Sequence, residues 1–266
     1  MSKASVVATQ ADTIKGLLDR AKRSFVPIRK SFVQQGSGKV RERGPLGALL
    51  THRDGRALDL YLVVHAAASA EPFDITLSGE VWARAAGLRE GPAAPSALSG
   101  LSAISKAFRR LEAVRLITRD RDGSRSKVTL LDEAGTGAAY VRPVDKTERY
   151  LKLPHEYWTE GWSGQLKLPA KVMLLIALSL DDGFYLPVEK GPPWYGISSD
   201  TVSRGFEQLI HDELLAVDIN QKKAPLSPQG FTTERHYTLK PPFGPVRAQA
   251  QALPKRRTVK RPEGSL

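Results

Sequence analysis

The clearest pattern of hydrophobic and polar positions in the chain is a helical stripe that begins at Leu101. Leu101, Ile104, Phe108 and Leu111 recur at the spacing of one helix face. Serine, lysine and arginine side chains occupy the opposite face. A helix of this kind must bury its apolar side, and it can place its basic side against a negatively charged partner. The pattern therefore predicts an amphipathic helix that ends before Val114.

The hydrophobic period changes after this helix. Leu116 and Ile117 lead into a short strand, a charged turn centred on Asp122-Gly123 follows, and residues 128–131 form a second strand. Asp-Gly between two β-favouring runs is typical of a hairpin, because glycine tolerates a positive φ angle. The predicted order is helix, strand, basic hairpin and strand.

The same order recurs 98 residues further along the chain. In residues 199–218, Phe206 aligns with Phe108 and Arg204 aligns with Lys106. A strand and a polar hairpin follow this copy as well. A second pair of similar segments, residues 25–36 and 150–161, combines an extended run with an aromatic pair. These repeats favour an internal duplication, and we take the second pair as the start of each copy.

The remaining pattern divides the chain into five parts. We expect the N-terminal helix to pack either on its own domain or on a second protomer, which leaves a homodimer open. The prediction is a leader and helix at 1–24, a first domain at 25–131, a linker at 132–149, a second domain at 150–243 and a basic disordered tail at 244–266.

Several smaller elements follow from local residues. Asp54-Gly55 is expected to break the helical run 46–68, and Ser78 is expected to cap the next helix. Gly191 to Gly196 are expected to replace most of a helix in the second domain. The other expectations are a helix at 11–25, a polar loop at 34–43, strands at 75–77, 214–219 and 235–239, and a helix at 168–180.

The two copies share the pattern S-[K/R]-[A/G]-F-x-x-L before a strand and a polar hairpin. It spans Ser105 to Leu111 and Ser203 to Leu209. This arrangement resembles the recognition helix and wing of winged helix-turn-helix DNA-binding domains. The resemblance implies an α+β, mainly helical fold with two tandem winged-helix domains. The Pro- and Gly-rich turn at 89–99 departs from it, because a tight helix-turn-helix has a shorter turn.

The composition supports a polyanionic partner and excludes some chemistry. The 266 residues include 40 Lys and Arg against 28 Asp and Glu, a formal net charge of +12. Hydrophobic residues make up 41% of the chain, which is enough for real cores. The absence of cysteine excludes disulfides, thiolate metal sites and cysteine nucleophiles.

The sequence offers no motif for catalysis or for a cofactor. The five histidines are scattered without metal-ligand spacing, and the Gly36 to Lys39 stretch lacks the other residues of a phosphate loop. We therefore expect no enzyme activity, no metal, no cofactor and no small-molecule ligand. The chain also lacks an apolar run of membrane-spanning length and a secretory signal at its start, so we expect no membrane contact and a cytoplasmic location.

Double-stranded DNA is the predicted partner, because a helix fits the major groove and its Lys or Arg side chains reach guanine edges. For a single arginine, a solvated surface charge is an equal alternative. The predicted contacts in the first domain are Ser99, Ser102, Lys106, Arg109 and Arg110 on the helix and Arg119, Arg121, Arg125 and Lys127 on the wing. Those in the second are Ser199, Asp200, Thr201, Arg204 and Gln208 on the helix and Lys222, Lys223 and Arg235 on the wing.

Three functions fit these predictions. The first is a transcriptional regulator that reads a specific duplex sequence. The second is a replication initiator of a plasmid or mobile element, since some initiators resemble this plan of two winged helices in one chain. The third belongs to another class, a winged-helix adaptor that binds proteins, in which the basic faces would carry solvated charge only.

Overall fold

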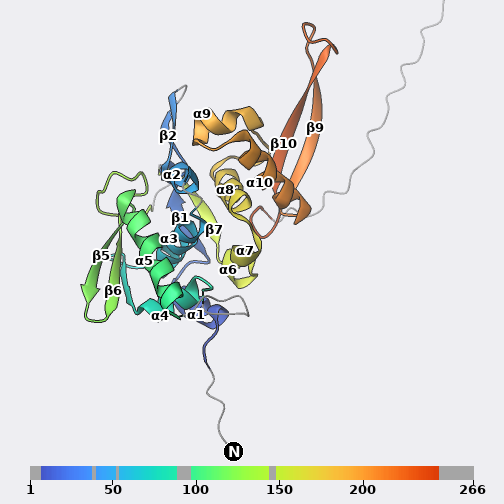
Figure 1. The fold of residues 1–266 in the computed structure, drawn as a ribbon. Helices are drawn as coiled ribbons and strands as arrows, with labels where there is room; N and C mark the ends of the chain where they lie inside the picture. The colour runs from blue at the N-terminus through green and yellow to red at the C-terminus, as the bar shows by residue number, and fades with distance from the viewer. Residues whose placement is uncertain (1–6, 38–39, 52–53, 89–96, 144–147, 246–266) are drawn as a thin grey trace, which may run out of the picture.

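The protein, described by a computed structural model, has an α+β fold with helices at its centre and small antiparallel sheets around them (Figure 1). The predicted α+β class is therefore confirmed. No helix in the described part of the chain is both long and apolar enough to cross a membrane. The structure describes residues 7–37, 40–51, 54–88, 97–143 and 148–245.

The helices of the first half are α1 (Gln10–Leu18), α2 (Pro45–Thr51), α3 (Gly55–Ala67), α4 (Gly79–Ala85) and α5 (Ala97–Ala113). Helix α3 lies at the centre, and its Leu58, Tyr61 and Leu62 are fully buried. Asp54 caps the start of α3 by accepting a hydrogen bond from the Ala57 amide at 3.0 Å. The predicted break before α3 is confirmed, and so is the cap of α4 by Ser78.

A three-stranded antiparallel sheet flanks these helices. It contains β4 (Asp74–Leu77), β5 (Ile117–Asp122) and β6 (Arg125–Leu130), in the order β4-β6-β5. Gly123 has a φ angle of 61° in the turn between β5 and β6, a conformation that glycine adopts without strain. The predicted hairpin is therefore confirmed. Val128 and Leu130 are buried on its inner side.

The second half contains a similar order of elements. These are α8 (Leu168–Ser179), β8 (Phe184–Tyr185), α9 (Gly191–Tyr195), α10 (Ser199–His211), β9 (Leu215–Lys223) and β10 (Phe231–Leu239), after the short helices α6 (Glu156–Thr159) and α7 (Trp162–Gln165). A 3-10 turn, η2 (Val188–Lys190), precedes α9. The strands lie in the order β8-β10-β9. Two expectations need correction: residues 191–195 form a short helix, and strands β9 and β10 are each nine residues long.

The two halves are joined by a two-stranded sheet. In it, β1 (Phe25–Arg29) pairs antiparallel with β7 (Tyr150–Pro154), and Val26 lies opposite Leu153. The predicted opening segments of the two domains thus pair with each other. After the turn η1 (Lys30–Phe32), β2 (Gln34–Ser37) and β3 (Val40–Arg43) form a hairpin where a polar loop was expected.

The β2–β3 hairpin reaches the second half of the chain. Gln34 Nε2 donates a hydrogen bond to the Trp194 carbonyl oxygen at 3.0 Å. The Arg41 guanidinium lies over the Trp194 ring, 4.0 Å from its centroid. Both contacts attach the polar hairpin to α9. These contacts help to fix the second half relative to the first.

Residues 132–149 were expected to form a linker, but much of their described part packs into the first half. Glu133 is fully buried, and its Oε2 lies 2.7 Å from Nη1 of Arg29. Burial raises the pKa of Glu133, although the hydrogen bonds from Arg29 oppose this shift. Tyr140 is also buried. The domain boundaries themselves stay a prediction.

The N-terminal helix is shorter than predicted and packs on its own chain. Helix α1 ends at Leu18 rather than near residue 25, and Thr9 caps its start. Arg84 of α4 donates a hydrogen bond to Thr13 Oγ1 at 2.7 Å. Ile14 and Leu17 are buried in the core. The first of the two expected packing modes, on its own domain, is therefore present.

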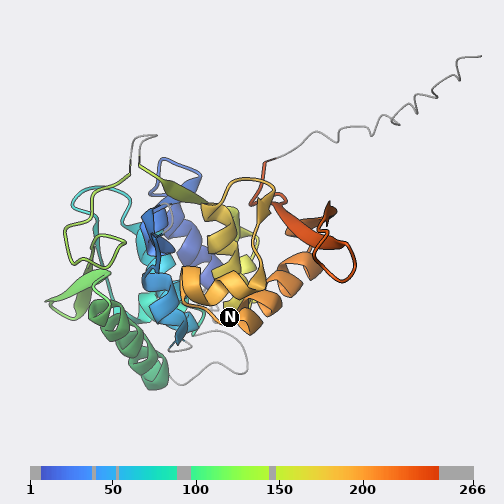
Figure 2. The ribbon, with the colours of Figure 1, turned by 90° about the horizontal axis from the view of Figure 1, so that it is seen from above.

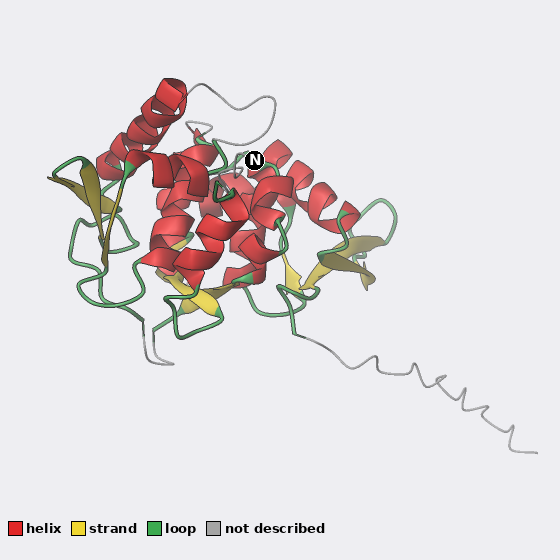
Figure 3. Ribbon diagram, turned by 90° about the horizontal axis from the view of Figure 1, so that it is seen from below, coloured by secondary structure: helices red, strands yellow, loops and turns green. Residues whose placement is uncertain are grey.

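Helices α5 and α10 lie along the same side of the molecule (Figures 2 and 3). Their hairpins, β5–β6 and β9–β10, lie at the two outer flanks (Figure 1). The β1–β7 sheet lies on the other side (Figure 3). Helices α5 and α10 thus share one side of the molecule, whereas the two hairpins point toward opposite ends of it (Figure 1).

Candidate nucleic-acid interface

Helix α5 buries its apolar stripe as the hydrophobic period predicts. Phe108 is 1% exposed, and its ring meets the edge of Trp82 with centroids 5.3 Å apart. Because Phe108 turns inward, Ser102, Lys106 and Arg109 are exposed on the opposite face. Ser99 is exposed near the start of the helix. The predicted outer face of α5 is therefore present.

The three basic residues of α5 have different surroundings. Lys106 and Arg109 form no ion pair with any described residue. Arg110 Nε, by contrast, lies 3.2 Å from Oδ2 of Asp54, the capping residue of α3. Arg110 therefore ties α5 to α3, whereas Lys106 and Arg109 are available to an anionic partner.

The four predicted wing residues also divide into two kinds. Arg119 is half-buried, pairs with Glu112 at 3.4 Å and lies over the Phe108 ring. Lys127 lies 3.0 Å from Asp74 across the sheet, and this hydrogen bond raises the pKa of the lysine. These two residues stabilise the sheet and its contact with α5.

The other two wing residues point to solvent. Arg121 is exposed and forms no ion pair within the described chain, and Arg125 pairs with Asp122 at 3.2 Å across the turn. A groove of about 290 Å³ runs between α5 and the wing. Ser105, Arg121 and Ser126 are among its lining residues. The groove brings a hydroxyl of α5 to the same surface as the hydroxyl and guanidinium groups of the hairpin, and the Asp120 carboxylate lines it as well.

Helix α10 has a different outer face. Asp200 and Arg204 are both exposed and pair with each other one turn apart. Glu207 is exposed on the same helix, and Ser199 is half-buried. The exposed charges of this stretch are thus two carboxylates against one guanidinium. A net negative face of this kind repels phosphate.

Two predicted residues of α10 serve the fold. Thr201 is buried, and its hydroxyl lies 2.9 Å from the Ser198 hydroxyl at the helix cap. Gln208 accepts a hydrogen bond from the Lys167 amide at 3.1 Å and donates one to the Gln165 carbonyl at 3.2 Å. Both side chains already form hydrogen bonds within the chain. We therefore leave Thr201 and Gln208 out of the interface proposed below.

The long β9–β10 hairpin carries the three basic side chains that were predicted as wing contacts. Lys222, Lys223 and Arg235 are all exposed. Lys222 lies 3.5 Å from Glu234 on the neighbouring strand. Phe206 anchors this unit, since it is 4% exposed and stacks on Tyr237 of β10 with centroids 4.2 Å apart. The second unit thus has an apolar anchor like the first, with its exposed positive charge on the wing.

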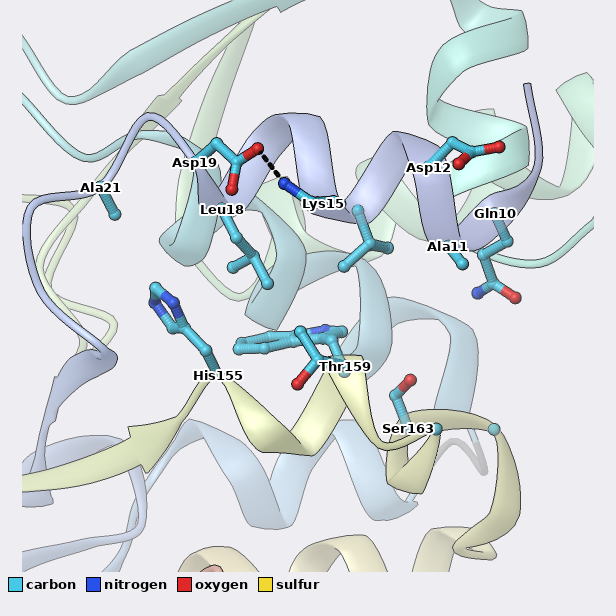
Figure 4. Close-up of a pocket in the computed structure, with 14 residues that line it drawn as sticks. Gln10, Ala11, Asp12, Lys15, Leu18, Asp19, Ala21, His155, Thr159 and Ser163 are labelled. Atoms are coloured by element: carbon cyan, nitrogen blue, oxygen red, sulfur yellow. Dashed lines mark hydrogen bonds and ion pairs between the residues drawn. The ribbon is translucent and has the colours of Figure 1, made fainter.

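A cavity of about 810 Å³ lies between α1 and the α6–α7 segment (Figure 4). Lys15 pairs with Asp19 at 2.6 Å, and Asp12 accepts hydrogen bonds from Thr9. The charged groups of its α1 wall are therefore paired within the chain. Among the described residues, no group of three His, Cys, Asp or Glu could hold a metal ion.

A second cavity of about 630 Å³ carries residues that were not predicted as a site. Arg20, Lys22, Arg23 and Arg142 are among the residues that line it. One feature of the sequence pointed to this cluster, because three of the four cations lie within residues 20–23. Arg142 is brought to them from far along the chain by the tertiary fold.

No protein-family model, curated protein sequence or solved structure matches this chain. The functional argument therefore depends on the geometry and chemistry of the chain itself.

Proposed function

We propose that the protein binds double-stranded DNA through α5 and the β5–β6 wing. The observation that carries this proposal is the face formed by Ser102, Lys106 and Arg109, which is exposed and has no acidic partner in the described chain. Arg121 extends the positive charge onto the wing. A helix inserted in the major groove can use these donors on guanine and phosphate, while the wing positions the protein on the backbone.

We further propose that the two halves are tandem winged-helix units related by duplication. Three facts support this: the elements follow the same order, the sheet orders β4-β6-β5 and β8-β10-β9 correspond, and Phe108 and Phe206 are both buried. Each unit thus places a helix beside the hairpin that follows it, as a winged helix does.

The two units then have unequal roles. The negative outer face of α10 is a poor match for DNA, so the second unit contributes its wing, with Lys222, Lys223 and Arg235. Because α5 and α10 lie along the same side of the molecule (Figures 2 and 3), we propose that this wing contacts phosphates of the same duplex. We propose base reading by the first unit and backbone contact by the second.

The biological role is proposed as transcriptional regulation, with replication initiation as the second candidate. Both roles use the same DNA-binding surface. Footprinting on the DNA that surrounds the coding region distinguishes them. Protection of a promoter supports a regulator, and protection of a series of repeats at an origin supports an initiator.

Fluorescence anisotropy with a labelled mixed-sequence duplex tests the DNA-binding proposal. We expect the logarithm of the affinity to fall linearly with the logarithm of salt concentration, with a slope of about −0.9 per phosphate contact. Lys106→Ala with Arg109→Ala should weaken binding and make the slope shallower by up to about 2, according to how many of the two contact phosphates.

The matched control removes two exposed positive charges elsewhere. Arg149 lies just before β7 and Lys152 lies within it, and both are exposed. Strand β7 itself lies on the side away from α5 and α10 (Figure 3). Arg149→Ala with Lys152→Ala should leave affinity nearly unchanged, although the net charge falls equally. Equal losses in the two double variants would mean that α5 is no specific interface. Absence of salt-dependent binding in the wild type would favour the protein-binding adaptor.

A further inference from the structure

The second cavity, of about 630 Å³, is built from segments that are far apart in sequence. The loop after α1, the start of β1, the end of α3 with the turn after it, Val141-Arg142 and His155 all border it. Its size falls within the range of small-molecule sites. Its border strand β1 lies in the sheet on the side away from α5 and α10 (Figure 3), so the cavity is separate from the proposed DNA surface.

The ionisable side chains around this cavity are mostly positive. Arg20, Lys22, Arg23 and Arg142 line it, and Glu71 is the one carboxylate among its lining residues. Arg20 and Lys22 are exposed, whereas Arg23 and Arg142 are half-buried. An anion that enters would meet flexible cations at the rim and a more rigid guanidinium further in.

Three buried nitrogen atoms belong to side chains that line the cavity. Nε2 of His65, Nε of Arg142 and Nε2 of His155 have no hydrogen-bond partner within the described chain. His65 is 5% exposed, and its pKa is lowered to about 3, chiefly by burial. A buried polar group without a partner is costly to keep in a fold. Each of these atoms is closed off from water, so a ligand in the cavity would be held by the accessible groups of the lining rather than by these nitrogens.

The cavity also has an aromatic wall held in an unusual conformation. Phe73 has a φ angle of 58°, in the left-handed region that bulky side chains rarely adopt. The Arg142 guanidinium lies over its ring, 5.1 Å from the centroid. Phe25 lines the cavity as well. Strained backbone tends to occur at ligand sites, and here it places an apolar surface beside a cation.

We propose that this cavity binds a small organic anion. Arg142, helped by Arg23 and Lys22, would hold a carboxylate or phosphate group. The apolar body of the ligand would pack against Phe25 and Phe73. The inference is independent of the proposed DNA binding, because it uses none of the α5 or wing residues.

Isothermal titration calorimetry of the full chain tests the proposal with three probes. Benzoate and phenyl phosphate carry a ring with a carboxylate or a phosphate, and benzyl alcohol carries a ring without charge. We expect saturable one-site binding of at least one anion in the millimolar range or tighter, and binding of benzyl alcohol at least about tenfold weaker. The stronger of the two anions identifies the acidic group.

Matched variants locate the site. Arg142→Gln should weaken anion binding by about tenfold or more, and Arg121→Gln on the wing should leave it unchanged. Should Arg142→Gln fail to fold, Arg20→Gln with Lys22→Gln removes the two exposed rim charges and should weaken binding severalfold. Absence of saturable binding of both anions, or equal binding in these variants and the wild type, would overturn the proposal. DNA affinity is measured in parallel and should be unaffected by Arg142→Gln.

Discussion

Lys171 of α8 donates hydrogen bonds from Nζ to both carboxylate oxygens of Asp59 on α3, at 2.6 and 2.7 Å. The lysine is buried, and the Asp59 side chain is 29% exposed. Burial raises the pKa of Asp59, although Lys171 opposes this shift. The pair joins the central helices of the two halves. It therefore helps to set the position of α10 and its wing relative to α5.

Loss of the carboxylate at Asp59 should destabilise the fold. Asp59→Asn leaves the Lys171 ammonium buried without its counter-ion, so we expect the free energy of unfolding to fall by about 2–3 kcal/mol. This is less than for a fully buried pair because Asp59 is partly solvated. Urea unfolding measures the change. Asp59→Leu with Lys171→Leu should recover most of the loss, and an equal loss in both variants would show that packing matters more than charge.

Removal of the Phe108 ring should affect stability, whereas removal of the nearby charges should not. Phe108→Ala is expected to lower the free energy of unfolding by about 3–5 kcal/mol, because the ring is buried against Trp82. Lys106→Ala with Arg109→Ala should change it by less than about 0.5 kcal/mol. Thermal and urea unfolding of both variants check this contrast. A large loss of stability in the charge variant would mean that those side chains pack in the core.

Gly205 allows α10 to approach α8 closely. A Cβ at this position would stand 2.6 Å from the Pro169 carbonyl oxygen and would also collide with the Met173 side chain. Gly205→Ala should therefore lower the free energy of unfolding by about 1–3 kcal/mol, in spite of the better helix propensity of alanine.

Gly16 provides the matched control for this substitution. It lies within α1, and a Cβ added there would have no neighbouring atom within 4 Å. Gly16→Ala should raise the free energy of unfolding by up to about 1 kcal/mol. Stabilisation by Gly205→Ala in the same urea assay would show that the helices can separate without loss.

The buried His65 should make the protein sensitive to acid. Its pKa is lowered to about 3 by burial and by Arg142 and Arg29, whereas the unfolded chain titrates near 6.5. The folded state thus favours the neutral ring, and the stability it contributes is complete above pH 6.5 and is lost as pH falls toward 3. We expect a loss of about 2 kcal/mol between pH 7 and pH 5.

The comparison with His65→Gln isolates this effect. Glutamine has no proton to gain in this range, so the variant should lose about 2 kcal/mol less than the wild type between pH 7 and pH 5. Asp59 and Glu133, whose pKa values are raised, act in the opposite direction and contribute equally to both proteins. Urea unfolding at a series of pH values measures how the free energy of unfolding of each protein depends on pH. The same pH dependence in both proteins would contradict the prediction.

The sequence by itself determined the local elements. The apolar stripes of α5 and α10, the turn at Gly123 and the cap at Ser78 are confirmed, because helix period, turn chemistry and capping depend on residues within a few positions of one another. The inward positions of Phe108 and Phe206 followed from the same period.

Only the tertiary structure decided which side chains remain available on the surface. Arg110 is paired with Asp54, which is 56 residues away, and Gln208 is bound to the segment before α8. The pairing of β1 with β7 likewise joins distant segments. Such contacts depend on which distant segments the tertiary fold brings together. The hydrophobic period of a single helix or strand carries no information about those long-range contacts.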